Sequence, residues 1–323
     1  MAKRGGSRGK SSRRQGSANR KWLRLGLAVL LGILAAGVVW LWHCFEPADR
    51  KAEVKHLCGN YLRRQNQATF LELTVDLWQL YRGDGVPCEY APGDAPVYGG
   101  LPEATTGALR VLRNQAYWVG YDERRRNPAW VAYRLFDSRE NLAGPRPVGF
   151  VTDLRTIAQV SSEHYTGSGF DRGHLAPNFG IGRCYGPEAQ QETFLMSNIV
   201  PQRHALNAGD WKKLELREAI NYAGRFQEIW IITGPIFNPE LIRELPSGIP
   251  IPESFYKIVV DEQCGRLRAI AFRFQHDAPT LSSLNQALCT IDELEALTGL
   301  DFFPELPSAV QEELESRRPI SAW

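Results

Sequence analysis

The chain has 323 residues, of which 43% are hydrophobic and 23% are charged, values typical of a globular protein. This length fits one large domain or two ordinary ones. The net charge of +2 conceals an asymmetry, because residues 1–24 hold nine basic side chains and no acidic one, whereas residues 25–323 carry a net charge of −7. The composition therefore excludes a protein that binds nucleic acid through its overall positive field. Binding of a phosphate chain would need a local basic patch and a metal ion.

An uncharged apolar stretch covers residues 25–42. A helix of that length extends about 27 Å, enough to cross the hydrocarbon core of a bilayer. The basic residues lie only on its N-terminal side, which predicts that this side faces the cytoplasm. We therefore expect a disordered basic tail (residues 1–24), a transmembrane signal anchor (residues 25–43) and an extracytoplasmic remainder. The periplasmic side of a bacterial membrane is favoured, with the mitochondrial intermembrane space as the alternative.

Two other interpretations of the N-terminus stay open. A cleaved secretory signal also joins basic residues to an apolar core, and mitochondrial transit peptides are also rich in Arg and Ser and poor in acids. The apolar core here is longer than in most secretory signals, and residues 1–20 lack an amphipathic stripe. Both observations favour the uncleaved anchor.

Outside the cytosol, the six cysteines of the chain can form disulfides. Their spacing includes no C-x-x-C pair and no Cys/His cluster typical of zinc, so we expect no structural zinc site. Sequence alone does not fix the pairing, and Cys264 with Cys289 is the pair we favour. The six are Cys44, Cys58, Cys88, Cys184, Cys264 and Cys289.

Residues 44–85 are expected to form a helical stalk. Apolar residues recur at helical spacing in two runs between residues 48 and 82, and a segment rich in Gly and Pro ends the second run. We interpret this pair of helices as a packed spacer between membrane and domain, with a partner-binding helix pair as the alternative.

From residue 86 onward, short runs rich in β-branched and aromatic residues alternate with turns. Because strands and helices do not alternate strictly, the pattern predicts an α+β domain over residues 86–318. The expected strands are 109–112, 117–121, 130–135, 228–233, 255–260 and 267–274, and the expected C-terminal helices are 281–288, 291–297 and 309–317.

A histidine lies in the middle of the chain within the sequence Asp171-Arg172-Gly173-His174. Histidine can take a proton near neutral pH. A lone histidine is more often a structural residue, but the neighbouring arginine supplies a forked, permanently charged donor suited to phosphate oxygens. This segment is therefore a candidate catalytic motif.

A helix is expected over residues 206–222, with Asn207, Trp211 and Glu215 on one face at four-residue spacing. Amide and carboxylate oxygens are hard ligands that suit Mg²⁺ or Ca²⁺, and a site with few protein oxygens suits Mg²⁺, which keeps its waters. The alternative is that Asn207 caps the helix and Glu215 is an exposed charge.

These segments together resemble one known family. The sequence GFDRGHLAP at 169–177 resembles the signature of the DNA/RNA non-specific endonucleases, the ββα-metal or His-Me finger nucleases. The sequence SNIVPQ at 197–202, followed by Asn207, Trp211 and Glu215, is similar to the second block of that family. Further similarity at 127–133, 233–237 and 297–304 extends the resemblance over residues 86–316.

The resemblance implies a domain with a central, mostly antiparallel sheet flanked by helices, and an enzyme that hydrolyses DNA and RNA to 5′-phosphate products. It implies that His174 is the general base and that Asn207 is the one protein side chain on Mg²⁺, with Mn²⁺ or Ca²⁺ as substitutes. It further implies that Glu215 holds waters on the metal and that Arg172 and Asn198 support the site.

The arginines that hold the substrate are less well defined by the resemblance. Relatives often carry an arginine one turn past the glutamate, where this chain has Ala219. Arg146 and Arg134 are candidates for a phosphate contact upstream of the motif, and Arg126 is a third candidate in an arginine-rich turn. The oligomeric state stays open, a dimer included.

Two other functions are alternatives to the membrane-anchored endonuclease. One is a phosphodiesterase of the same fold that acts on a non-nucleic substrate, which the net charge of −7 supports slightly. The other is a catalytically silent nucleic-acid-binding module, which the presence of His174 and Asn207 disfavours.

Overall fold

The computed structural model describes residues 30–323, apart from residues 31, 35–36, 39, 43, 65–68, 83–84 and 139. No helix within this described part is both long and apolar enough to cross a membrane. The predicted basic tail, and most of the predicted anchor at 25–43, lie outside the described residues. The chain divides into two units, Met1–Lys55 and His56–Trp323, and the second unit holds the elements that form the candidate site.

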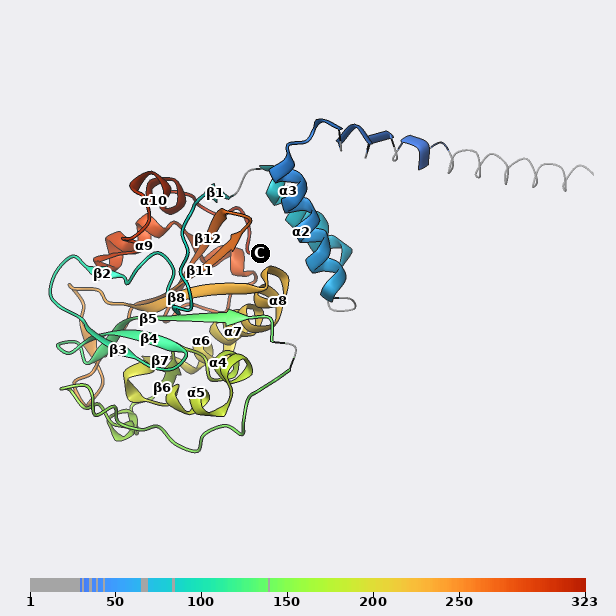
Figure 1. Cartoon of the computed structure of the whole chain (residues 1–323). Coiled ribbons are helices and arrows are strands. Elements are labelled where there is room, and N and C mark those ends of the chain that lie inside the picture. Colours follow the sequence, from blue (N-terminus) through green and yellow to red (C-terminus); the bar gives the residue numbers. More distant parts are fainter. Residues whose placement is uncertain are drawn as a thin grey trace, which may run out of the picture. The chain divides into compact units, whose positions relative to one another are not determined.

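An eight-stranded sheet forms the centre of the second unit, in the order β1-β12-β11-β8-β5-β4-β3 (Figure 1). Strand β13 also pairs with β12. Every pairing within this sheet is antiparallel, which confirms the mostly antiparallel sheet that the family resemblance implies. Its strands are β1 (Val86–Pro87), β3 (Arg110–Arg113), β4 (Tyr117–Asp122), β5 (Asn127–Phe136), β8 (Glu228–Ile236), β11 (Ser254–Gln263), β12 (Arg266–Gln275) and β13 (Leu288–Cys289).

Three two-stranded ladders accompany the sheet. They pair β2 (Glu103–Ala104) with β14 (Leu300–Asp301), β6 (Asp171–His174) with β7 (Ile199–Gln202), and β9 (Arg243–Glu244) with β10 (Pro250–Ile251). The ladder of β6 and β7 carries the predicted catalytic motif.

Helices outside the predicted catalytic helix include α2 (Ala48–Arg64), α3 (Phe70–Arg82), α4 (Asn178–Tyr185), α5 (Pro187–Glu192), α9 (Ile291–Thr298) and α10 (Ser308–Glu315). The predicted helix at 206–222 consists of five consecutive helical pieces: α6 (His204–Leu206), a π-helical turn (Asn207–Trp211), α7 (Lys212–Leu216), a second π-helical turn (Arg217–Tyr222) and α8 (Ala223–Phe226).

Two apolar cores cover the two faces of the sheet. Successive residues of a strand point to opposite faces. Tyr133 accordingly packs in a core with Trp211 and Leu214, whereas its neighbour Ala132 packs in a core with Leu294 and Leu314. The first core therefore supports the predicted catalytic helix, and the second lies beneath α9 and α10.

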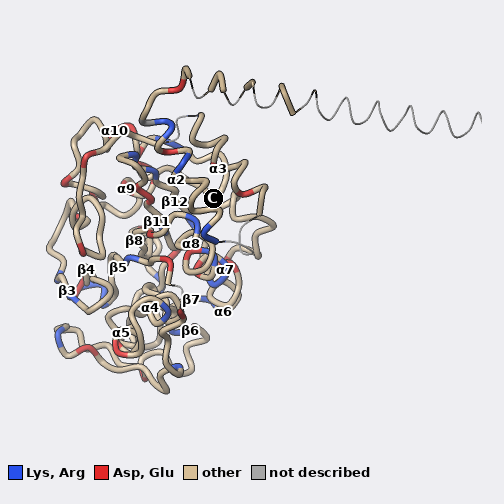
Figure 2. Tube along the Cα trace, turned by 45° about the vertical axis from the view of Figure 1, so that its right-hand side comes forward, with Lys and Arg blue, Asp and Glu red and all other residues tan. Residues whose placement is uncertain are grey.

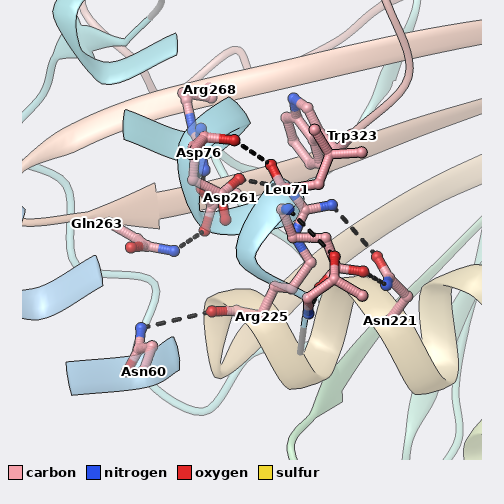
Figure 3. Close-up of polar contacts among 12 residues, drawn as sticks. Asn60, Leu71, Asp76, Asn221, Arg225, Asp261, Gln263, Arg268 and Trp323 are labelled. Atoms are coloured by element: carbon pink, nitrogen blue, oxygen red, sulfur yellow. Dashed lines mark hydrogen bonds and ion pairs between the residues drawn. The ribbon is translucent and has the colours of Figure 1, made fainter. Parts of the chain in front are cut away.

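Polar side chains connect helices α2 and α3 to the end of α8 (Figure 3). Asp76 forms a buried ion pair with Arg225, whose backbone carbonyl also accepts a hydrogen bond from Asn60. Gln227 donates to the Asn60 side chain at 2.9 Å. The part of the expected stalk that lies in the second unit is thus packed on the domain rather than separate from it.

Two local expectations are wrong. The segment 281–288 is not a helix, because it forms only a 3₁₀ turn, Leu284–Ala287, before its last residue joins strand β13. The favoured disulfide is also wrong, since Cys289 is a buried free thiol, and burial raises its pKa to about 12.

Candidate active site

Strands β6 and β7 place the predicted catalytic motif at the edge of the first core. His174 lies opposite Ile199, and Gly173 lies opposite Val200. A side chain at Gly173 would bring its Cβ to 2.7 Å from the Cβ of Gln202, so the close approach of β7 requires glycine beside the histidine.

Asn198 fastens the backbone that follows His174. Its amide donates to the carbonyls of Ala176 and Thr193, at 3.0 and 2.8 Å, and its carbonyl accepts from the Ala176 N–H at 2.8 Å. The side chain is fully buried. Because these bonds occupy both ends of the amide, Asn198 positions the motif and does not reach a substrate.

The His174 ring lies among aromatic side chains with an unused nitrogen. Ring centroids of Phe194 and Phe150 are 4.8 and 5.4 Å from it, and Nε2 is buried without a hydrogen-bond partner. Burial, followed by the charge of Arg146, lowers the pKa of His174 to about 3. The imidazole is therefore neutral at pH 7 and able to accept a proton at Nε2.

Asp171 orients the start of the predicted catalytic helix. Its Oδ2 accepts from the Asn207 amide at 2.9 Å and lies 2.8 Å from Nδ1 of His204. With its nitrogen held by Asp171, Asn207 has its carbonyl oxygen left for a ligand. Asp171 and His174 both belong to strand β6, so this contact ties the start of the predicted catalytic helix to the strand that carries the predicted base.

The helix departs from regular α geometry at the residues of interest. Asn207–Trp211 is a π-helical turn, and Gly209 within it has non-helical backbone angles. Such π turns often occur at functional sites. Trp211 is fully buried against Phe255 and donates from Nε1 to the His174 carbonyl at 3.3 Å. It is therefore a core residue that ties the helix to the motif.

Glu215 presents a second unused oxygen. Its Oε1 is buried without a hydrogen-bond partner. Burial raises its pKa to about 7, although Lys257 opposes that effect. A cation beside this carboxyl would favour the ionised form. The Asn207 carbonyl oxygen and the unpartnered Glu215 oxygen are both of the ligand type that a hard divalent cation prefers.

A buried charged network lies beneath the helix. Lys257 on β11 donates to Glu218 and to the Tyr133 hydroxyl, both at 2.9 Å. Lys257 and Glu218 are fully buried, and the ammonium group is 4.8 Å from the centre of the Trp211 ring. Sequence reasoning missed this network, because a lysine within a strand pattern reads as a solvent-facing charge.

The four arginines predicted for the site, Arg126, Arg134, Arg146 and Arg172, have different surroundings in the structure. Arg146 is exposed, lies over the Phe194 ring at 5.0 Å and acts electrostatically on His174. Arg172 donates to the Ser162 carbonyl from Nε at 3.2 Å and from Nη2 at 2.6 Å. Arg126 donates to the Ser247 carbonyl at 3.0 Å. Of these three, Arg146 is the one whose charge reaches the base.

Arg134 does not belong to the site, contrary to the sequence-based expectation. Its guanidinium pairs with Glu228 and lies 5.4 Å from the Trp230 ring, which packs in the second core. Tyr133, the preceding residue, packs in the first core, so strand alternation directs Arg134 to the face opposite His174.

Asp171 is the site residue whose role sequence reasoning missed. It stands inside the motif, but only the structure shows that its carboxylate reaches across to Asn207 and His204. The sequence does carry one signal for this role, since a carboxylate lies three residues before the predicted base on a short strand. Strand alternation directs the Asp171 side chain away from His174, and the start of the catalytic helix packs against Asp171.

Comparison with known proteins identifies the family of this chain. A family model described as DNA/RNA non-specific endonuclease matches residues 102–309. A nuclease from Nostoc sp. is 29% identical over 239 residues, and the match covers 68% of this chain and 82% of that nuclease. Human mitochondrial endonuclease G is 29% identical, and the match covers 66% of this chain and 74% of endonuclease G.

The fold also matches a solved structure. A chain from the crystal structure of the EndoG/EndoGI complex, titled for the mechanism of EndoG inhibition, superposes with a TM-score of 0.58 at 22% identity. The match covers 65% of this chain and 90% of the solved one.

Proposed function

This chain belongs to the DNA/RNA non-specific endonuclease family and is a nucleic-acid hydrolase, and from that premise we propose that it cleaves DNA and RNA internally. In this proposal His174 is the general base and Asn207 is the protein ligand of Mg²⁺. Glu215 assists by holding water molecules on the metal. The observation that carries the proposal is the neutral His174 ring, whose unpartnered Nε2 lies on the same short strand as the Asp171 carboxylate that holds Asn207.

In the proposed reaction, water attacks phosphorus while Nε2 of His174 takes its proton, and the bond from phosphorus to the 3′-oxygen breaks. The leaving 3′-oxygen takes a proton from solvent and becomes a hydroxyl. The pKa of about 3 makes the free enzyme a weak base. The negative phosphate of a bound substrate would raise that pKa, because a nearby opposite charge favours the imidazolium form. Proton transfer would then be most favourable with substrate in place. A general base of this kind contributes about 10²–10⁴-fold to the rate.

The remaining residues bind and orient the phosphodiester. Arg146 and Arg172 would offer guanidinium donors to the phosphoryl oxygens, while Asn198 keeps the motif backbone fixed. A divalent cation, when bound, supplies positive charge for the leaving 3′-oxygen. None of these groups is arranged to recognise a base edge, so little sequence preference is expected.

The test is cleavage of covalently closed circular DNA and of single-stranded RNA by the full-length chain, with Mg²⁺ and then with excess chelator. We expect both polymers to be cut with Mg²⁺ and neither with chelator. Closed circles have no ends, so their cleavage establishes endonuclease action. Cleavage only of a non-nucleic phosphodiester, or undiminished activity in chelator, would contradict the proposal.

We further propose that residues 25–43 anchor the enzyme in a membrane and leave the catalytic domain outside the cytoplasm. The uncharged stretch at 25–42 and the basic residues confined to its N-terminal side support this topology. Alkaline extraction of membranes from cells that express the chain should leave it in the pellet, and external protease should digest the domain. Release into the alkaline supernatant would contradict the anchor.

A further inference from the structure

Three carboxylates meet between α9 and α10. Asp292 and Glu295 are one helical turn apart on α9, and Glu315 is the last residue of α10. Each offers an oxygen, and these oxygens all lie within 4.8 Å of one another. Figure 2 shows acidic residues, in red, on both helices. The two helices contribute to the core on the sheet face opposite His174, so the cluster is separate from the candidate active site.

Glu315 is the carboxylate of the cluster whose burial is least favourable. The residue is only 6% exposed, and its Oε1 is buried without a hydrogen-bond partner. The carboxyl also lies at the C-terminus of α10, where the helix dipole disfavours negative charge. A buried, unpartnered carboxylate beside other acids needs a compensating positive charge.

We propose that Asp292, Glu295 and Glu315 form a second divalent-cation site, of the Ca²⁺ type, which ties α10 to α9. Oxygens within 4.8 Å of one another need only small side-chain adjustments to bind one ion at about 2.4 Å, the distance typical of Ca²⁺. Glu295 accepts the Phe302 N–H at Oε1, at 2.7 Å, which fixes its carboxylate and leaves the other oxygen for the ion. Waters complete the coordination, since Ca²⁺ takes six to eight oxygens in flexible geometry.

A shared proton is the competing explanation for the cluster. Two carboxyls in contact can hold one proton between them, which removes the repulsion without an ion. The two explanations differ in their response to Ca²⁺. A protonated cluster gains nothing when Ca²⁺ is added, whereas a cation site stabilises the folded chain in proportion to its occupancy.

The test compares thermal unfolding of the chelator-treated full-length chain at pH 7.5 with and without 5 mM Ca²⁺. The variants are Glu315→Gln, the matched control Glu312→Gln on the exposed side of the same helix, and Asn207→Ala at the proposed active site. We expect Ca²⁺ to raise the Tm of the wild type by about 3–5 °C, for an affinity on the order of 10⁻⁴–10⁻³ M.

The rise should persist in Glu312→Gln and Asn207→Ala and disappear in Glu315→Gln. In chelator, Glu315→Gln should melt no lower than the wild type, because it removes a buried charge, and this outcome shows that the variant folds. An equal rise in Glu315→Gln, or no rise in the wild type, would overturn the proposal. Loss of the rise in Asn207→Ala would assign the effect to the active site instead. Nuclease activity of Glu315→Gln reports separately on the proposed function.

Discussion

At the scale of single residues, the candidate site depends on two polar atoms that the fold leaves unsatisfied. Nε2 of His174 and Oε1 of Glu215 are both buried without a partner. An unsatisfied buried polar group costs about 1–3 kcal/mol. Their lack of partners is consistent with the proposed reaction, in which each atom acquires a partner only when substrate or cation binds.

Arg146 and Arg134 provide a matched pair of predictions. Arg146→Ala should lower kcat/KM on DNA about 10–100-fold, because it removes a charge-assisted contact to phosphate. The same variant should make DNA binding less sensitive to salt. Arg134→Ala should leave kcat/KM within about twofold, since its guanidinium pairs with Glu228 on the other face of the sheet. Steady-state cleavage at two salt concentrations measures both. Equal losses in the two variants would contradict the assignment.

At the scale of elements, the catalytic helix is held by a charged network below it and by a histidine near its start. The π-helical turns shift its residues relative to a regular helix, so the four-residue spacing in the sequence did not determine which side chains point inward. Trp211 illustrates the consequence. The sequence placed it on a functional stripe, but its ring is packed in the core and only its Nε1–H reaches the motif.

Lys257→Met should destabilise the fold by about 3–5 kcal/mol, because it leaves Glu218 buried without its partner. The variant should also move the activity profile to higher pH, since Lys257 opposes the rise in the pKa of Glu215. The double variant Lys257→Met/Glu218→Gln removes both charges and should recover most of the stability. Urea denaturation checks the free energies of unfolding. A double variant no more stable than Lys257→Met alone would refute the pairing argument.

We expect the stability of the fold to depend on pH through His276. It is buried, Nδ1 lies 2.6 Å from the Pro252 carbonyl, and Nε2 accepts the Arg203 N–H, just before α6. Burial lowers its pKa below the ordinary 6.5, so the unfolded chain binds this proton more readily. The stabilising contribution is complete above pH 6.5 and is lost as the pH falls below it.

The check is urea denaturation of the wild type and of His276→Gln, which does not titrate. The stability advantage of the wild type should shrink between pH 7 and pH 5. An advantage that stays constant over this range would mean that His276 does not titrate as described.

At the scale of the whole molecule, the sequence predicted the six long segments of the central sheet and the order of the motif blocks. It could not predict the sheet face on which Arg134 lies, because that depends on the register of β5 against its neighbours. Nor could it predict that α2 and α3 pack on the domain, since that contact joins Asp76 and Arg225, which are far apart in sequence.

Asp76→Ala tests whether α2 and α3 are part of the folded domain. The substitution leaves Arg225 buried without its partner and should lower the free energy of unfolding by about 3 kcal/mol. As the control, Glu313→Ala removes an exposed ion pair with Arg317 and should cost under about 1 kcal/mol. Chemical denaturation of the full-length variants compares the two. Equal small losses would indicate that α2 and α3 are an independent stalk.

The central claim is that Nε2 of His174 takes the proton from the attacking water. The most direct measurement is the rate of plasmid cleavage in Mg²⁺ by His174→Ala, alone and with added imidazole. We predict a fall of at least about 10²-fold, a thermal unfolding midpoint close to that of the wild type, and partial recovery of the rate with imidazole. Near-normal cleavage by His174→Ala without imidazole would contradict the account.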